Sequence, residues 1–228
     1  MRYAHFITAG YLFLLSGSTI GAAVGAAFDP HGFRPRCNFD PAAASGNRLL
    51  AWDGSNSVSI DVPASAHYRA GEGDTLSASG NADMLRHLRL RDGHVEFDCD
   101  GNWGKDRLQI ELPGRSFRGF AVGGTGRLML EKINQPSLTI TLAGATGATA
   151  SGQVDHLNLS VAGSSKLGVG ALKARSVNLS IAGSGDVETA PQDDIHINIA
   201  GSGTVRLVTE PRRVESSVVG SGRIIHPQ

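Results

Sequence analysis

Aromatic side chains and net charge are both scarce in this 228-residue chain. Phe, Trp and Tyr make up 6% of the residues, and 21 Lys and Arg are balanced by 21 Asp and Glu, so the formal net charge is zero. A chain with no excess of positive charge has no long-range attraction for nucleic acid or for an anionic membrane. The composition therefore predicts a protein with no nucleic-acid partner.

Long apolar runs are also missing after the first residues. The start, "MRYAHFITAGYLFLLSGSTIGAAVGAAFDP", has a positive Arg2, a mostly apolar stretch at 6–15 and small residues at 21–27. This order is typical of a secretory signal, and the apolar stretch is short for a membrane span of about 20 residues. We predict a signal peptide at 1–27 and an exported protein (periplasmic, outer-surface or extracellular), with a membrane anchor as the alternative.

Cysteine occurs only twice, as Cys37 and Cys99. A structural zinc site takes about four ligands, and "FDCDGNW" around Cys99 has none of the usual ligand spacing. An even number of cysteines in an exported chain is typical of disulfide pairing. The two residues therefore predict a structural disulfide, and two free thiols are the alternative.

Glycine, in contrast, is abundant, with 30 residues in the chain. From about residue 120, glycines recur in similar phrases such as "SIAGSGDV" and "NIAGSGTV". The first glycines of successive phrases are 20, 19, 20, 18 and 19 residues apart, and in order they are Gly124, Gly144, Gly163, Gly183, Gly201 and Gly220. A period near 19 residues, kept over six copies, indicates a solenoid.

Each repeat has a strand before its glycines in which apolar and polar residues alternate. Alternate side chains of a strand point to opposite faces, and stacked coils about 4.8 Å apart place like residues above like. We therefore predict an all-β fold, a parallel β-helix or solenoid with coils of about 19 residues. Its core column is Leu138, Ile140, Leu142, Leu157, Leu159, Val161, Val177, Leu179, Ile181, Ile195, Ile197 and Ile199. Its outward polar column is Thr139, Thr141, Asn158, Ser160, Asn178, Ser180, His196 and Asn198.

The N-terminal half predicts a less regular β structure. Residues 57–70 and 107–120 share an apolar-x-Ile-acid-apolar-Pro pattern, and Asp92-Gly93 predicts a tight turn between two short strands. No stretch has a sustained helical period. The predicted organisation is a signal peptide at 1–27, an N-terminal arm at 28–47 and a β-solenoid domain at 48–228.

The start of the chain, "SIDVP", "LRLRDGHVEFD" and the repeated glycine phrases together resemble one known family. The chain is similar, over roughly residues 48–226, to the bacterial proteins called putative auto-transporter adhesin, head GIN domain. The resemblance implies an exported β-helical domain with no assigned enzyme activity, and it supplies no catalytic residues. Residues 48–228 are accordingly expected to be a head GIN-like β-solenoid domain.

The Gly-Ser-Gly phrases have two interpretations, as reactive sites or as corners of the solenoid. A nucleophile elbow needs Gly-x-Ser-x-Gly before a helix, and a phosphate-binding loop needs a longer glycine motif. Neither occurs, and repetition favours corners where glycine adopts a positive φ or avoids a clash. The predicted corner residues are Gly124, Gly126, Gly144, Gly163, Gly183, Ser184, Gly185, Gly201, Ser202, Gly203, Gly220, Ser221 and Gly222. The repeats "GATGA" (144–148) and "GSSKLG" (163–168) lack the second glycine and are candidates for a different corner.

Acidic residues gather in one repeat as Asp186, Glu188, Asp193 and Asp194. A calcium site takes about six to eight oxygen ligands, which here would have to stack in successive coils. The positions matching Asp186 instead hold Arg127, Lys166, Thr204 and Arg223. We therefore predict a solvated surface and no metal, cofactor or catalytic site. Trp52 and Trp103 are expected to pack in the protein rather than to stack on a sugar.

These features predict an exported, non-enzymatic β-solenoid protein for cell-surface interaction, adhesion or envelope structure. Its expected contacts run through the outward polar column to an envelope or extracellular polysaccharide or protein, with self-association through an end coil. The alternative is a carbohydrate-binding or carbohydrate-active β-helix protein, which would require a stacked acidic cleft. A polymerising scaffold resembling bactofilins is a third reading, against which the export signal argues.

Overall fold

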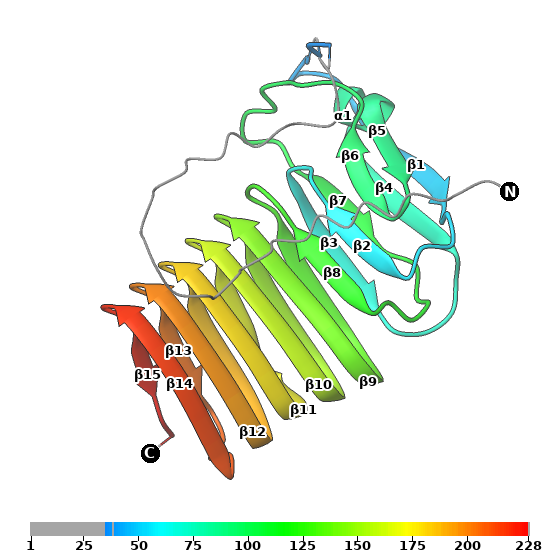
Figure 1. Ribbon diagram of the computed structural model, residues 1–228. Coiled ribbons are helices and arrows are strands. Elements are labelled where there is room, and N and C mark those ends of the chain that lie inside the picture. The colour runs from blue at the N-terminus through cyan, green and yellow to red at the C-terminus, as the bar shows by residue number, and fades with distance from the viewer. Residues whose placement is uncertain (1–34, 38, 228) are drawn as a thin grey trace, which may run out of the picture. The chain divides into compact units, whose positions relative to one another are not determined.

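The computed structural model describes residues 35–37 and 39–227, which are built mainly of stacked β-strands (Figure 1). The predicted signal peptide at 1–27 lies outside the described residues, as does the first part of the predicted arm. The N-terminal elements are β1 (Ser45–Ala51), β2 (Ser57–Ile60), β3 (Ala64–Arg69), β4 (Thr75–Asn81), α1 (Ala82–His87), β5 (Leu88–Arg91), β6 (His94–Phe97), β7 (Leu108–Glu111) and β8 (Gly119–Val122). The repeat forms β9 (Arg127–Gly144), β10 (Gly147–Gly163), β11 (Lys166–Gly183), β12 (Asp186–Gly201), β13 (Thr204–Leu207), β14 (Arg213–Gly220) and β15 (Arg223–Ile225). Among the described helical residues, none forms a segment long and apolar enough to cross a membrane.

The strands β9 to β12 are parallel and pair in the register that the repeat predicts. Leu138 on β9 lies beside Leu157 on β10, which lies beside Val177 on β11. Every residue of the predicted apolar column is at most 3% exposed. Burying one such side chain stabilises the fold by about 1.5–3 kcal/mol, so the column forms a continuous core. The parallel β-solenoid predicted from the sequence is confirmed.

The corner between successive strands depends on the first glycine of each phrase. Gly183 has a φ of +119°, a conformation that L side chains rarely adopt. A Cβ on Gly183 would lie 2.6 Å from the carbonyl oxygen of Gly163 in the coil below. The next amide, that of Ser184, donates a hydrogen bond of 2.9 Å to the same oxygen. The backbone conformation and the closeness of the stack both therefore require glycine here.

The two phrases that lack a second glycine turn the same corner, so the expectation of a different one is wrong. Gly144 and Gly163 have φ values of +104° and +91°. The second glycine is replaced by Thr146 and Ser165, whose side chains are buried. Their hydroxyl oxygens are 2.8 Å apart, and the Ser165 hydroxyl also donates to the Gly144 carbonyl at 3.1 Å. These hydrogen bonds satisfy the two polar groups inside the stack, which lets hydroxyl residues take the place of glycine.

The N-terminal half extends the solenoid by a different chain path. Strands β3 and β8 both pair in parallel with the first long strand, β9. The tight turn predicted at Asp92-Gly93 joins the antiparallel pair β5 and β6, and both turn residues have positive φ. Helix α1 was not expected, because its six residues are too few for a helical period to be recognised. It begins after Asn81, whose side-chain oxygen accepts a hydrogen bond from the amide of Asp83 at 2.9 Å.

The aromatic residues that the structure describes all lie in this half and pack on one another. The rings of Trp52 and Tyr68 both lie edge-on to Phe117, with centroids 5.0 and 5.6 Å away. Burial raises the pKa of the Tyr68 phenol above its ordinary value. Trp103 packs against Phe97 with a centroid separation of 4.2 Å. Both tryptophans therefore contribute to packing, as their sequence context suggested.

The last described coil is more exposed than the coils before it. All residues of β14 are exposed, and Ser216 takes the place of an apolar core residue, opposite Ile197 on β12. Val218 on the same strand is 41% exposed. The described residues therefore leave one end of the apolar column open.

Candidate functional site

The serines of the corner phrases lie on the surface. Ser184, Ser202 and Ser221 are exposed, each in its own coil. Within the part of the chain that the structure describes, none of these hydroxyls has a histidine or a carboxylate as a hydrogen-bond partner. A serine nucleophile needs an adjacent base to be activated, so the geometry at these corners supports a structural role.

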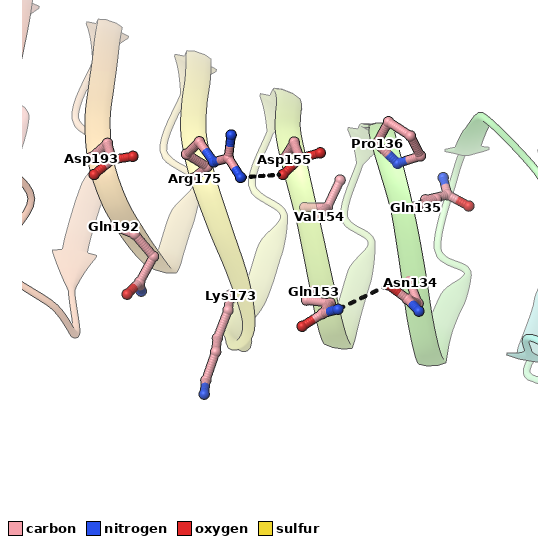
Figure 2. Close-up of a pocket in the computed structure, with 10 residues that line it drawn as sticks. All are labelled: Asn134, Gln135, Pro136, Gln153, Val154, Asp155, Lys173, Arg175, Gln192 and Asp193. Carbon is pink, nitrogen blue, oxygen red and sulfur yellow. Dashed lines mark hydrogen bonds and ion pairs between the residues drawn. The ribbon is translucent and has the colours of Figure 1, made fainter.

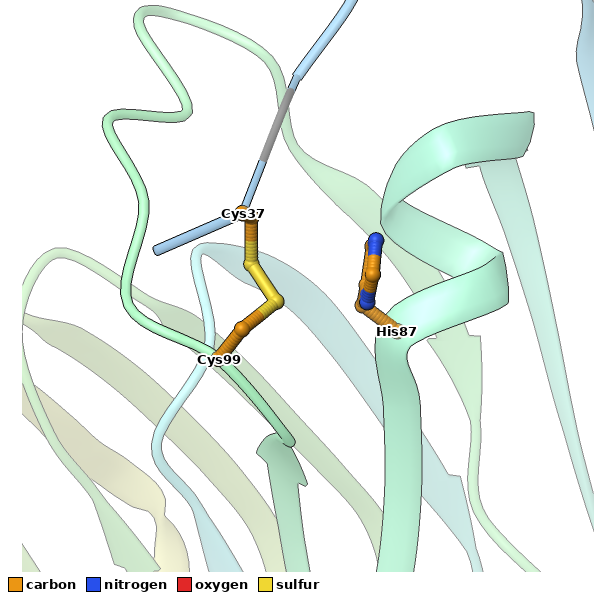
Figure 3. Close-up of side chains that lie close together, drawn as sticks. All are labelled: Cys37, His87 and Cys99. Carbon is orange, nitrogen blue, oxygen red and sulfur yellow. A yellow bond between two sulfur atoms is a disulfide. The ribbon is translucent and has the colours of Figure 1, made fainter. Parts of the chain in front are cut away.

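Cys37 and Cys99 are joined by a disulfide whose Cα atoms are 5.3 Å apart (Figure 3). His87, at the end of α1, lies beside it, and one ligand-type atom from each of the three residues falls within a 4.8 Å cluster. The Nδ1 atom of His87 is 2.9 Å from Asp98, which also pairs with Arg89. Metal binding by cysteine requires thiolates, and the disulfide removes them. The disulfide therefore links the segment around Cys37 covalently to the rest of the domain.

The acidic residues of one repeat do not converge on a single point. Asp193 and Asp194 each face an arginine of the following coil, Arg212 and Arg213, at 3.4 Å. Asp186 lies in another part of the coil, at the start of β12, and is paired in register with Lys166 on β11. The carboxylates are thus divided between two stretches of the coil, each beside positive side chains.

A polar groove crosses the strands β9 to β12 where each coil bends (Figure 2). It has a volume of about 470 Å³ and is lined by side chains that occupy similar places in successive coils. The side-chain amide of Gln153 donates to the Asn134 oxygen at 3.0 Å, and Arg175 pairs with Asp155 at 3.1 Å. We call this surface the amide groove. Amides, guanidinium and carboxylate together offer both donors and acceptors, which suits ligands rich in hydroxyl groups.

A second groove, with a volume of about 890 Å³, lies over the strands that follow the corners. Its walls include Arg107, Arg127 and Lys166. Gly147 and Gly168 also line it, and because they have no side chains they leave backbone exposed in the groove. We call this surface the glycine groove. The sequence reasoning missed both grooves, although Gly147 and Gly168 are visible in the sequence as glycines outside the corner positions.

One end of the glycine groove carries a small network of charged side chains. His67 lies between two carboxylates, with Nδ1 3.0 Å from Glu111 and Nε2 3.2 Å from Glu131. Arg69 pairs with Glu131 at 2.6 Å. The hydrogen bond from Arg69, and then that from His67, lowers the pKa of the Glu131 carboxyl below its ordinary value. Both carboxylates at this end are therefore already engaged by positive or hydrogen-bonding groups.

Comparison with known proteins agrees with this architecture. The family described as "Putative auto-transporter adhesin, head GIN domain" matches residues 69–211. A crystal structure of a putative adhesin from Bacteroides fragilis is similar with a TM-score of 0.60 at 17% identity, covering 83% of this chain and 100% of that one. A putative lipid binding protein from Parabacteroides distasonis is similar with a TM-score of 0.50 at 16% identity, covering 81% of this chain and 97% of that one. At these identities the likeness establishes the fold alone. Among curated proteins, none matches the sequence.

Proposed function

Because this chain belongs to the family of the putative auto-transporter adhesin head GIN domain, we propose that it is an exported, non-enzymatic solenoid that attaches the cell to a surface. The amide groove is the contact surface in this proposal. The observation that carries it is the alignment of hydrogen-bonding side chains along four consecutive strands, β9 to β12 (Figure 2). Such an array meets an extended partner at several points at once.

The chemistry of the amide groove supports contact rather than reaction. Its opposite charges are already partly paired, as Arg175 with Asp155. The Gln153 and Asn134 amides hold each other in place, which lowers the conformational entropy lost when a partner binds. Each polar contact is weak, but several contacts repeated along a rigid stack bind one extended partner together, which raises the overall affinity.

The disulfide between Cys37 and Cys99 supports the exported part of the proposal. Disulfides persist in oxidising compartments and are rare where thiols are kept reduced. This bond joins residues 62 apart in the sequence, and Cys99 is 5% exposed. A disulfide with this reach is typical of proteins that work outside the cytosol.

The proposal is tested in cells that carry or lack the gene for this chain. We expect protease added to intact cells to remove the protein, and deletion to lower retention of cells on a polysaccharide-coated surface under flow several-fold. Complementation with the variant Gln153→Ala/Gln192→Ala should restore the protein level but not the retention. The matched control Asn198→Ala, which removes an exposed amide on β12 outside both grooves, should restore both. Retention that is unchanged by deletion, or a protein protected from external protease, would contradict the proposal.

A further inference from the structure

Two positions in the floor of the glycine groove are occupied by glycine, although neither the backbone conformation nor a close contact requires it there. Gly147 and Gly168 do not have the left-handed φ of the corner glycines. A Cβ on Gly147 would come no nearer than 3.9 Å to any neighbour, and one on Gly168 would lie 3.6 Å from the Thr149 methyl, an ordinary contact. Glycine inside a strand costs about 0.5–1 kcal/mol relative to alanine. A strand glycine that the fold does not need often marks a place where a ligand approaches the backbone closely.

Positive side chains stand on both sides of Gly147, whereas Gly168 lies in register between Thr149 and Glu188. Gly147 lies in register between Arg127 on β9 and Lys166 on β11. All three positions face outward, because the next residue on each strand is buried in the core: Leu128, Ala148 and Leu167. Two strand spacings separate the two cationic residues, which places their backbones about 10 Å apart.

A third cation completes the wall of the glycine groove. One terminal nitrogen of Arg107, Nη1, donates to the carbonyl and the hydroxyl oxygen of Thr125, at 2.6 and 3.2 Å. These bonds hold the guanidinium at the corner that leads into Arg127. Among the described residues, no carboxylate lies within ion-pair distance of Arg107, Arg127 or Lys166. Asp186 on β12 is in register with Lys166. Among the residues that line the groove, Glu111 is the one carboxylate, and it pairs with His67.

We infer that the glycine groove binds an acidic polysaccharide, with sugar rings over Gly147 and Gly168 and carboxylates on Arg107, Arg127 and Lys166. Spaced cations along a trough match an extended chain whose negative charges recur, and arginine binds carboxylates with two parallel hydrogen bonds. The hydroxyl of Thr149 and that of Ser164, both on the groove wall, suit the sugar hydroxyls. The site and its ligand are separate from the amide groove and do not depend on the protein's acting in attachment.

Two other anionic partners fit this surface less well. A bilayer is flat and cannot reach backbone that lies below flanking arginine and lysine side chains. Single-stranded nucleic acid binds through aromatic side chains on which the bases stack, and the residues that line the glycine groove include none. A recessed cationic trough without aromatics favours a flexible chain of sugars.

Binding of polygalacturonate to the purified protein tests the inference, with dextran as the neutral probe. We expect saturable binding of polygalacturonate that weakens as salt is raised, and little binding of dextran. The variant Arg127→Gln/Lys166→Gln should bind at least about tenfold more weakly, because two of the three charges that attract the carboxylates are gone. Arg223→Gln should bind as the unaltered protein does, since Arg223 occupies the same row in a coil outside the groove.

Three results would overturn the inference. They are equal binding of dextran and polygalacturonate, unchanged affinity in the double variant, and binding only to phosphatidylglycerol vesicles. Circular dichroism and the unfolding temperature of each variant confirm that the solenoid is intact. Loss of cell attachment in the amide-groove variant, with polygalacturonate binding kept, would separate this site from the proposed function.

Discussion

Replacing Gly183 with valine is expected to destabilise the solenoid by at least about 4 kcal/mol, which is exceptional for one substitution. Two costs add. Valine is strained at a φ of +119°, and its Cβ would lie 2.6 Å from the Gly163 oxygen. That oxygen accepts the hydrogen bond from Ser184, so the coils cannot separate without losing it.

The measurement is thermal unfolding, in which the midpoint should fall by about 10 °C for a chain of this size. Gly168→Val is the matched control, because the same substitution is made without a left-handed φ and its Cβ would make only an ordinary contact, 3.6 Å from the Thr149 methyl. It should leave the midpoint unchanged or raise it slightly. Ser184→Ala should also leave it unchanged, since its side chain is exposed. Equal midpoints for Gly183→Val and the unaltered protein would refute the structural role of the corner.

Removal of the disulfide in Cys37→Ser/Cys99→Ser is expected to cost about 4 kcal/mol, from the entropy that the bond removes from the unfolded chain. The bond closes a loop between residues 62 apart. Backbone hydrogen bonds between Cys37 and Asp100 and between Asp100 and Pro35, at 2.8 and 2.9 Å, hold the same segment. These bonds remain in the double variant, so the fold should survive with lower stability.

Urea unfolding with and without a reductant measures this effect. The midpoint of the unaltered protein should fall when reductant is added, whereas that of the double variant should be low and insensitive to reductant. The double variant is thus its own control for other effects of the reagent. A midpoint of the unaltered protein that does not respond to reductant would contradict the stabilising role of the disulfide.

The repeat made the solenoid predictable from the sequence. Residues such as Leu138, Leu157 and Val177 recur at the coil period, and in a parallel stack the same period sets their register. Local pattern and long-range pairing therefore carry the same information in this half. In the N-terminal half they do not, because β3 and β8 reach β9 from separate parts of the chain.

The features that the sequence predicts wrongly or does not predict also have physical causes. The sequence predicts a different corner at Thr146 and Ser165, because their mutual hydrogen bond depends on stacking that one repeat alone does not reveal. The glycine groove arises where outward positions lack side chains, and an alternating sequence pattern shows only the side chains that are present. Gly147 and Gly168 stand close in sequence to the corner glycines, although their conformations differ from those of the corners. Backbone geometry was needed to separate the two kinds of glycine.

One titration tests most directly whether Gly147 and Gly168 leave room for a ligand. Polygalacturonate is titrated into the variant Gly147→Leu/Gly168→Leu, whose added side chains would fill the floor of the glycine groove without changing its charge. The predicted result is a folded protein with the unfolding temperature of the unaltered chain and no measurable binding. Binding at the unaltered affinity would contradict the claim that these glycines leave room for a ligand.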